Sequence, residues 1–245
     1  IILSEKSSLP SETKEEIRRL NPSRVILIGG NTVLSDSLDK QLKEIKSNLV
    51  VERIGGSTRY DTSLLVAKKL DTIADVNKSY VCYGLGEADA LSIAAKAGEE
   101  KAPIILVEKN VTPKGTLDWL RGESLQTAYF IGGTTNISNA VISEINSITS
   151  SDVSGNRVAG INRYDTNAAV IKMFYTNTAQ SGISVTKGLV LADALTSGPM
   201  AAKFKTPIVL VDTELSNDQK QILSTKQTSL IYEIGGGINP SAVQD

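Results

Sequence analysis

ERIGGSTRYDT at residues 52–62 returns as NRVAGINRYDT at residues 156–166, and these two copies of one motif decide how the chain is organised. They place Arg59 and Arg163 at the same position, 104 residues apart. Three further motifs repeat with a spacing of 103 or 104 residues: ADAL at 88–91 and 192–195, APIILV at 102–107 and TPIVLV at 206–211, and the Gly-Gly ends of apolar runs at Gly29, Gly132 and Gly235. A fixed period of this length indicates an array of tandem units.

The repeats divide the chain into unequal parts. Residues 1–50 hold the C-terminal half of a first unit, residues 51–150 form a complete second unit, and residues 151–245 form a third. Because Ile1 lies 103 residues before Ile104, we expect roughly 50 further residues upstream that complete the first unit. We also expect the third unit to be truncated at its end, inside a predicted helix.

Each unit alternates short apolar runs with longer amphipathic stretches. RVILI (24–28), SYVCY (79–83) and PIILV (103–107) are rich in Val and Ile and are bounded by Gly or Pro, which predicts strands buried on both faces of a parallel sheet. Between such runs, apolar residues recur three and four positions apart, as in residues 34–45, and this spacing predicts helices. The alternation predicts a parallel α/β sheet with right-handed crossovers in each unit.

The third unit departs from this pattern at one turn. We assign its strand to GLVL at 188–191, which leaves very few residues before Asp193, whereas LGEA separates YVCYG from Asp89 in the second unit. Either the loop after Leu191 is shortened or a stretch of chain is omitted from the sequence at this place, and we favour the omission.

The composition disfavours several classes of function. Lys and Arg together number 26 and Asp and Glu 27, so the net charge of −1 creates no positive field that would attract nucleic acid or an anionic membrane. The chain lacks histidine, the usual general base and metal ligand, and its single Cys82 cannot form a thiolate zinc site or an intrachain disulfide. No stretch approaches about 18 consecutive apolar residues. We expect no cofactor, no metal, no nucleic-acid partner and no membrane insertion.

Two repeated features have a catalytic or ligand-binding interpretation that we consider the weaker one. A Gly-Gly pair between a strand and a helix can bind phosphate through backbone amides, but the chain has neither GxGxxG nor GxxxxGK[ST], so a structural turn is favoured. Asp89 and Asp193 could form half of a carboxylate or metal site. Because Asp is common in the first turn of a helix for capping alone, a structural role is favoured for both.

The arginines are the stronger candidates for binding. Four of them recur in place in the second and third units: Arg53, Arg59, Arg157 and Arg163. The planar donor fork of Arg matches phosphate or carboxylate bidentately, so repeated positions would give equivalent anion sites. The alternative, which the sequence supports equally well, is a structural ion pair with Asp61 or Asp165. The neighbouring Tyr60 and Tyr164 would either pack on a sugar face or cover the helix end.

The four motifs together resemble the clostridial cell-wall-binding repeat of type 2: R-x-x-G-x-x-R-Y-D-T, then A-D-A-L, then P-I-[IV]-L-V, then an apolar strand ending in I-G-G. The resemblance implies a Toprim-like α/β fold for each unit, three units about a pseudo-threefold axis, and non-covalent attachment to an anionic wall polysaccharide or teichoic-like polymer. The family's wall-attachment motif, which without the resemblance reads as core strands or a place where units meet, maps onto Ile1, Ile2 and Leu3, onto Pro103, Ile104, Ile105 and Leu106, and onto Pro207, Ile208, Val209 and Leu210.

The sequence therefore predicts a secreted, non-enzymatic anchoring module that retains a surface-layer or cell wall protein on the cell surface. Its expected partners are the anionic polymer and neighbouring surface-layer proteins. Two alternatives remain open. The first is a Toprim-like enzyme in which Asp89 and Asp193 hold Mg²⁺. The second is a purely structural array protein that never contacts the polymer.

Overall fold

Three parallel sheets organise the chain, of which the computed structural model describes residues 1–244; the expected truncation after them lies outside the described residues. In spatial order, the first sheet contains β1 (Arg24–Ile28) and β2 (Val50–Ile54), the second β4 (Ile104–Val107), β3 (Lys78–Tyr83), β5 (Thr127–Ile131) and β6 (Arg157–Val158), and the third β8 (Ile208–Val211), β7 (Ile183–Lys187) and β9 (Ile231–Ile234). The strand pairs within these sheets are parallel, which confirms the predicted α/β class.

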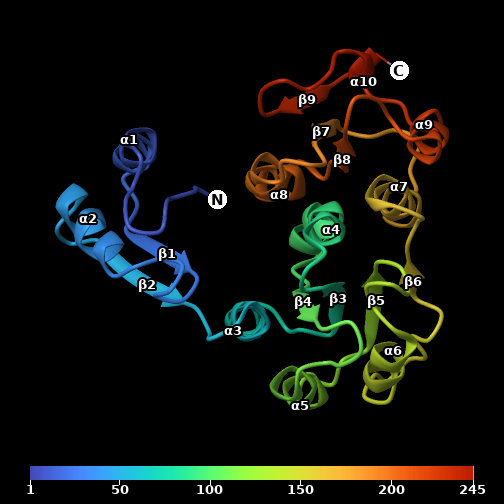
Figure 1. Ribbon diagram of the computed structural model, residues 1–245, viewed down its shortest axis with the longest axis horizontal. Coiled ribbons are helices and arrows are strands. Elements are labelled where there is room, and N and C mark those ends of the chain that lie inside the picture. The colour runs from blue at the N-terminus through green and yellow to red at the C-terminus, as the bar shows by residue number, and fades with distance from the viewer. Residues whose placement is uncertain (245) are drawn as a thin grey trace.

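Helices alternate with these strands, and Figure 1 shows the three units as blue, green-to-yellow and orange-to-red bodies. The helices are α1 (Ser11–Leu20), α2 (Ser37–Ile45), α3 (Arg59–Asp71), α4 (Glu87–Glu100), α5 (Lys114–Gly122), α6 (Asn139–Asn146), α7 (Arg163–Phe174), α8 (Ala192–Phe204), α9 (Asn217–Leu223) and α10 (Ser241–Gln244). None of the helices in residues 1–244 is long and apolar enough to cross a membrane.

Side-chain caps fix where α3 and α7 begin. Thr58 accepts a hydrogen bond from the Asp61 amide at 3.1 Å, and the Asp61 carboxylate accepts one from the Thr58 amide at 3.0 Å, which is a capping box. Asn162 accepts hydrogen bonds from two amides in the first turn of α7. The caps make Arg59 and Arg163 the first residues of their helices, so both arginines start from equivalent backbone positions.

The middle sheet changes its direction of strand addition between β3 and β5. The chain passes from β3 through α4 to β4 on one side, and then through α5 to β5 on the other side of β3. Such a reversal opens a crevice at the carboxyl ends of the two central strands, where open α/β sheets bind ligands. Gly84 and Gly132 directly follow β3 and β5 at this edge.

Strands β2 and β6 each belong to the sheet of the preceding unit. β2 pairs with β1, and β6 pairs with β5, although each lies at the start of a predicted unit. The units at 51–150 and 151–245 thus each contribute their first strand to the sheet of the preceding unit. Backbone hydrogen bonds of these strands therefore join consecutive units. Arg53 lies in β2 and Arg157 in β6.

The strand assignment at GLVL is wrong. The strand is β7, ISVTK, which ends at Lys187, while Leu189 and Val190 lie exposed in the following turn. From Gly84 to Asp89 and from Gly188 to Asp193 the spacing is the same, so the loop is not shortened and the omission that we favoured is also wrong. The apolar pattern predicted the wrong segment because β7 contains two polar residues, Ser184 and Thr186, that are both fully buried. The Ser184 hydroxyl lies 2.9 Å from the hydroxyl of Thr206.

The second and third units pack through α4 and α8, which face each other near the middle of Figure 1. Small side chains let the two helices approach closely: an added Cβ at Gly98 would lie 2.9 Å from the Cβ of Ala202. Ile208 and Leu210 of β8 belong to the same buried cluster as Ala88, Leu91 and Ala95 of α4. α4 also contacts α7, and the N-terminus of α7 lies beside the carboxyl edge of the middle sheet.

Candidate functional site

Arg59 and Arg163 are held in the same way in two different units. The Nη1 of Arg59 donates to the carbonyl of Gly84, and the Nη1 of Arg163 donates to the carbonyl of Gly188, both at 2.7 Å. Each carbonyl belongs to the residue directly after the central strand of its sheet. One donor of each guanidinium is thus fixed to the backbone, and the side chain stays at the carboxyl edge of the sheet. Nearly half of the Arg59 side chain remains exposed.

The two arginines differ in their acidic neighbours. Arg59 lies 3.5 Å from the carboxylate of Glu87. The equivalent position in the third unit is Leu191, and no ion pair of Arg163 occurs among the described residues. Arg163 is therefore the less neutralised member of the pair.

The alternative ion pairs with Asp61 and Asp165 do not form in the described structure. Asp61 accepts from the Thr58 amide and hydroxyl, and Asp165 accepts from the Asn162 amide group at 2.8 Å. Both carboxylates therefore hold the helix cap rather than the neighbouring guanidinium.

Tyr60 and Tyr164 pack against the strand ends. A Cβ added at Gly84 would overlap the ring of Tyr60, and one added at Gly188 would overlap the ring of Tyr164. Both rings are half-buried, and burial raises the pKa of each phenol above its ordinary value. The two rings thus lie beneath the same carbonyls that hold Arg59 and Arg163.

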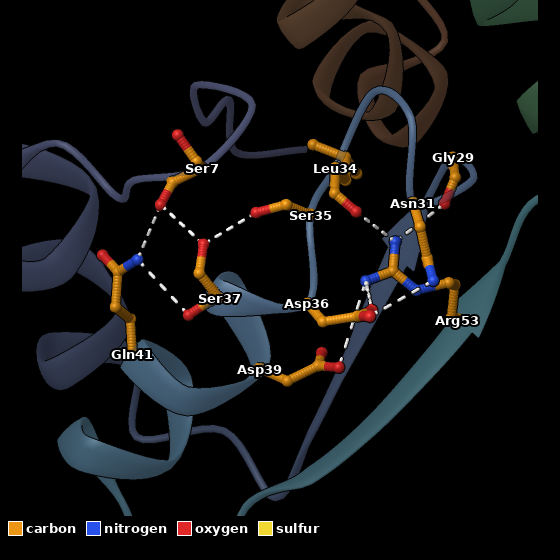
Figure 2. Close-up of polar contacts among 10 residues, drawn as sticks. All are labelled: Ser7, Gly29, Asn31, Leu34, Ser35, Asp36, Ser37, Asp39, Gln41 and Arg53. Atoms are coloured by element: carbon orange, nitrogen blue, oxygen red, sulfur yellow. Dashed lines mark hydrogen bonds and ion pairs between the residues drawn. The ribbon is translucent and has the colours of Figure 1, made fainter.

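Arg53 and Arg157 hydrogen-bond with loop backbone instead of pointing outward. The Nη1 of Arg53 donates to the carbonyls of Gly29 at 3.0 Å and Leu34 at 2.7 Å, and its Nη2 lies 3.6 Å from Asp36 and 3.9 Å from Asp39 (Figure 2). Only 21% of the Arg53 side chain is exposed. Its guanidinium therefore closes the loop between β1 and α2.

Arg157 does the same in the next sheet. Its Nη1 donates to the carbonyl of Gly132 at 2.8 Å, and its Nη2 donates to the Asn139 side chain at 3.0 Å. Burial lowers the pKa of the Arg157 guanidinium. The structure thus divides the four predicted arginines into two that brace loops and two that lie at the sheet edges with donors to spare.

The segments matched to the wall-attachment motif are largely core strands. Ile105, Ile208, Val209 and Leu210 are at most 1% exposed, and Pro103 and Pro207 are also buried. Ile104 and Leu106 are half-buried, and Ile1, Ile2 and Leu3 are exposed. Ile1 and Ile104 line one apolar groove between α4 and α8, together with Leu195. The repeated P-I-[IV]-L run therefore supports the region where the units meet.

A polar cavity of about 290 Å³ opens at the carboxyl edge of the middle sheet. Its wall combines the turn after β3, the turn after β5 and the N-terminus of α7, so Asp89, Asn136 and Arg163 all line it. Asp89 makes no capping bond to the α4 backbone in the described structure, and its Oδ2 instead accepts a hydrogen bond from the Asn136 side chain. Sequence reasoning did not predict this cavity, although the repeated ADAL motif marks Asp89.

The acidic residues do not gather as a metal site would require. Among residues 1–244, no group of three or more His, Cys, Asp or Glu side chains is placed to hold a metal ion. Asp193 instead lies against Gly235, at the third sheet. Asp89 lies against Gly132 at the second sheet, so the two aspartates of the alternative enzyme interpretation do not come together in one site.

Comparison with known proteins connects this arrangement to bacterial cell walls. The model of the family described as Cell wall binding domain 2 (CWB2) matches residues 53–142 and 157–242. Two solved structures from Clostridium difficile are similar: Cwp6, with 43% identity and a TM-score of 0.96, over 99% of this chain and 38% of that one, and Cwp8, with 33% identity and a TM-score of 0.87, over 100% of this chain and 42% of that one.

Two curated proteins from Bacillus subtilis strain 168 are also similar over 236 residues, or 96% of this chain. N-acetylmuramoyl-L-alanine amidase LytC is 28% identical over 45% of its own length, and Amidase enhancer is 25% identical over 31% of its length. The chain spans less than half the length of each of these relatives.

Proposed function

Because the chain belongs to the Cell wall binding domain 2 family, we propose that it is a non-enzymatic anchoring module that binds an anionic wall polymer non-covalently and retains a surface-layer or cell wall protein. The family associates the chain with the cell wall and the cell surface. The amidase chemistry named for one relative belongs to a protein more than twice as long as the matched part. The proposal concerns binding alone.

The observation that carries the proposal is the matched placement of Arg59 and Arg163. Each guanidinium donates one hydrogen bond to a backbone carbonyl at 2.7 Å. Its other N–H groups are left to bind a phosphate or carboxylate. A guanidinium that is already held loses less rotamer freedom when it binds, which lowers the entropic cost of association. Arg is also the side chain whose fork matches these anions in two parallel hydrogen bonds.

Repetition compensates for the weakness of each contact. An exposed ion pair contributes only about 0–1 kcal/mol and is screened by salt. Two or more equivalent sites on one body that engage a repeating polymer raise the avidity by roughly 10²–10⁴ over a single site. This explains why equivalent arginines occur in successive units of one chain.

The experiment compares Arg163→Ala, Arg59→Ala and the double variant in binding to purified wall polymer. We expect Arg163→Ala to weaken binding by up to about fivefold, in line with the loss of one exposed charged contact of at most about 1 kcal/mol. Arg59→Ala has a smaller effect because Glu87 already offsets its charge. The double variant binds more weakly than either single variant, and affinity of the unmodified chain falls as salt is added.

The matched control is Arg121→Ala, which removes an exposed, ion-paired arginine from α5. It leaves binding unchanged if position rather than total charge matters. Full retention on walls by a folded double variant would contradict the role of the arginines. Equal binding to intact and polymer-stripped walls would contradict the anchoring proposal itself and favour a purely structural array protein.

A further inference from the structure

Asp89 is a buried carboxylate with an incomplete set of partners. It is 5% exposed, and its Oδ2 accepts a hydrogen bond from the Asn136 side chain at 3.1 Å. Its Oδ1 has no hydrogen bond to any described residue, and the side chain lines the polar cavity. Removing a carboxylate from water is costly unless hydrogen bonds replace the lost hydration. Oδ1 is not sealed from solvent, so it can accept a hydrogen bond from a ligand in the cavity.

The backbone around Asp89 is shaped to leave the carboxylate at the cavity. Gly132 has φ of +130°, and a Cβ there would lie 2.9 Å from Oδ2 of Asp89. Burial raises the pKa of Asp89, while the hydrogen bond from Asn136 and the charge of Arg163 act in the opposite direction. A glycine at this position thus lets β5 approach a carboxylate that α4 carries.

The opposite wall comes from a different unit. Asn162, Arg163 and Thr166 of the third unit line the cavity together with Thr135 of the second. The cavity is therefore lined by two carboxylates, Glu87 and Asp89, by side-chain amides and hydroxyls, and by the guanidinium of Arg163. Its volume of about 290 Å³ equals roughly ten waters at ~30 Å³ each, which is room for one six-membered sugar ring.

We propose that this cavity is a subsite for one sugar unit of the wall polymer, in which Asp89 accepts a hydrogen bond from a sugar hydroxyl while Arg163 binds the adjoining phosphate or carboxylate. The inference rests on the proposed function and specifies how part of the polymer is recognised. A bare anion does not fit beside the Asp89 carboxylate, because like charges repel. A sugar unit with a hydroxyl group and a negative group at one side can interact with both Asp89 and Arg163.

The test uses polymer fragments of one to three repeating units, released from purified walls, and the 245-residue chain. Calorimetry measures fragment affinity, and the side-chain amide signals of labelled Asn136 report on the cavity directly. We expect Asp89→Asn, which keeps the shape but removes the charged acceptor, to weaken fragment binding at least tenfold. We also expect the Asn136 signals of the unmodified chain to shift as fragments are added.

Asp193→Asn is the matched control, since Asp193 is the equivalent residue of the third unit. The described chain has no counterpart of α7 opposite it, because the last helix, α10, corresponds to α6. This control binds fragments like the unmodified chain. Gly133→Val provides a second variant: an added Cβ there meets only Thr135, at 3.8 Å, so the fold tolerates the side chain while the cavity becomes smaller. It also loses fragment affinity.

The outcomes separate this inference from the anchoring proposal. If Asp89→Asn or Gly133→Val binds fragments as well as the unmodified chain, or if the Asn136 signals stay in place, the subsite is refuted. Anchoring then still stands if the Arg59 and Arg163 variants release the chain from walls. If Asp89→Asn fails to fold, Gly133→Val and the Asn136 signals decide. If neither set of substitutions affects binding, both proposals fail.

Discussion

Replacing Asn167 with alanine lowers the free energy of unfolding by about 3 kcal/mol, because four hydrogen bonds at a buried junction are lost together. Asn167 lies in α7 and is fully buried. Its Nδ2 donates to the Ile208 carbonyl at 2.8 Å and to Ser92 at 3.1 Å. Its Oδ1 accepts from the Leu210 amide at 3.2 Å and from Gln219 at 3.0 Å.

The cost is large because two of these partners are backbone groups at the free edge of β8, which pairs only with β7 in the described sheet. After the substitution, the Ile208 carbonyl and the Leu210 amide remain buried without a protein partner, and each unsatisfied group costs about 1–3 kcal/mol. A loss of 3 kcal/mol lowers the melting temperature of a chain of this size by about 6–12 °C. Thermal and denaturant unfolding measure both quantities.

Ser63→Ala is the control, because Ser63 is the equivalent residue of α3. Its hydroxyl donates to the Ile104 carbonyl and accepts from the Leu106 amide, both at 3.0 Å. Ser63 is only half-buried, so water replaces the lost hydroxyl and the expected cost is about 1 kcal/mol. Equal costs at the two positions would contradict the argument from burial.

Gly160→Ala destabilises the fold by about 3 kcal/mol and also weakens polymer binding, because the added Cβ collides with the first turn of α7. The new atom would lie 2.6 Å from the Thr166 amide nitrogen and overlap the backbone of Asp165. A backbone cannot rotate away as a side-chain end can. The start of α7 must therefore move, and the hydrogen bond from the Gly160 amide to the Thr166 hydroxyl is strained.

This prediction couples stability to binding, since the displaced turn carries Arg163. We expect the variant to bind polymer as weakly as Arg163→Ala, measured at a temperature where it remains folded. Gly155→Ala is the control in the same connection: an added Cβ meets no atom within 4 Å there, so the expected change is within about 0.5 kcal/mol. Unfolding curves that coincide for the two glycine variants would contradict the steric explanation.

The same close contact with the first helical turn explains why the repeat motif has a glycine three residues before its second arginine. Gly56 occupies the equivalent place before α3, and a Cβ there would overlap Asp61 as one at Gly160 would overlap Asp165. The sequence alone revealed that R-x-x-G-x-x-R-Y-D-T is repeated but gave no reason for its glycine. The reason is the packing of the first helical turn onto the strand end.

The arginines show how far sequence reasoning reaches. Their spacing identified all four positions, and two of them, Arg59 and Arg163, carry the proposed function. The same spacing could not tell that the guanidinium groups of Arg53 and Arg157 close the loops after β1 and β5. Repetition at one position indicates that a residue has the same role in each unit, but it does not indicate what that role is.

By itself, the sequence determined the tandem organisation, the parallel α/β class and the residues shared between units, because apolar periodicity and repeat spacing are local properties of the chain. Only the tertiary structure decided that ISVTK is a strand, that β2 and β6 join the preceding sheets, and that Asp89 and Arg163 of different units line one cavity. These outcomes depend on which groups meet across long separations in the chain. Packing and hydrogen bonding between distant segments settle them, and no local pattern records the partners.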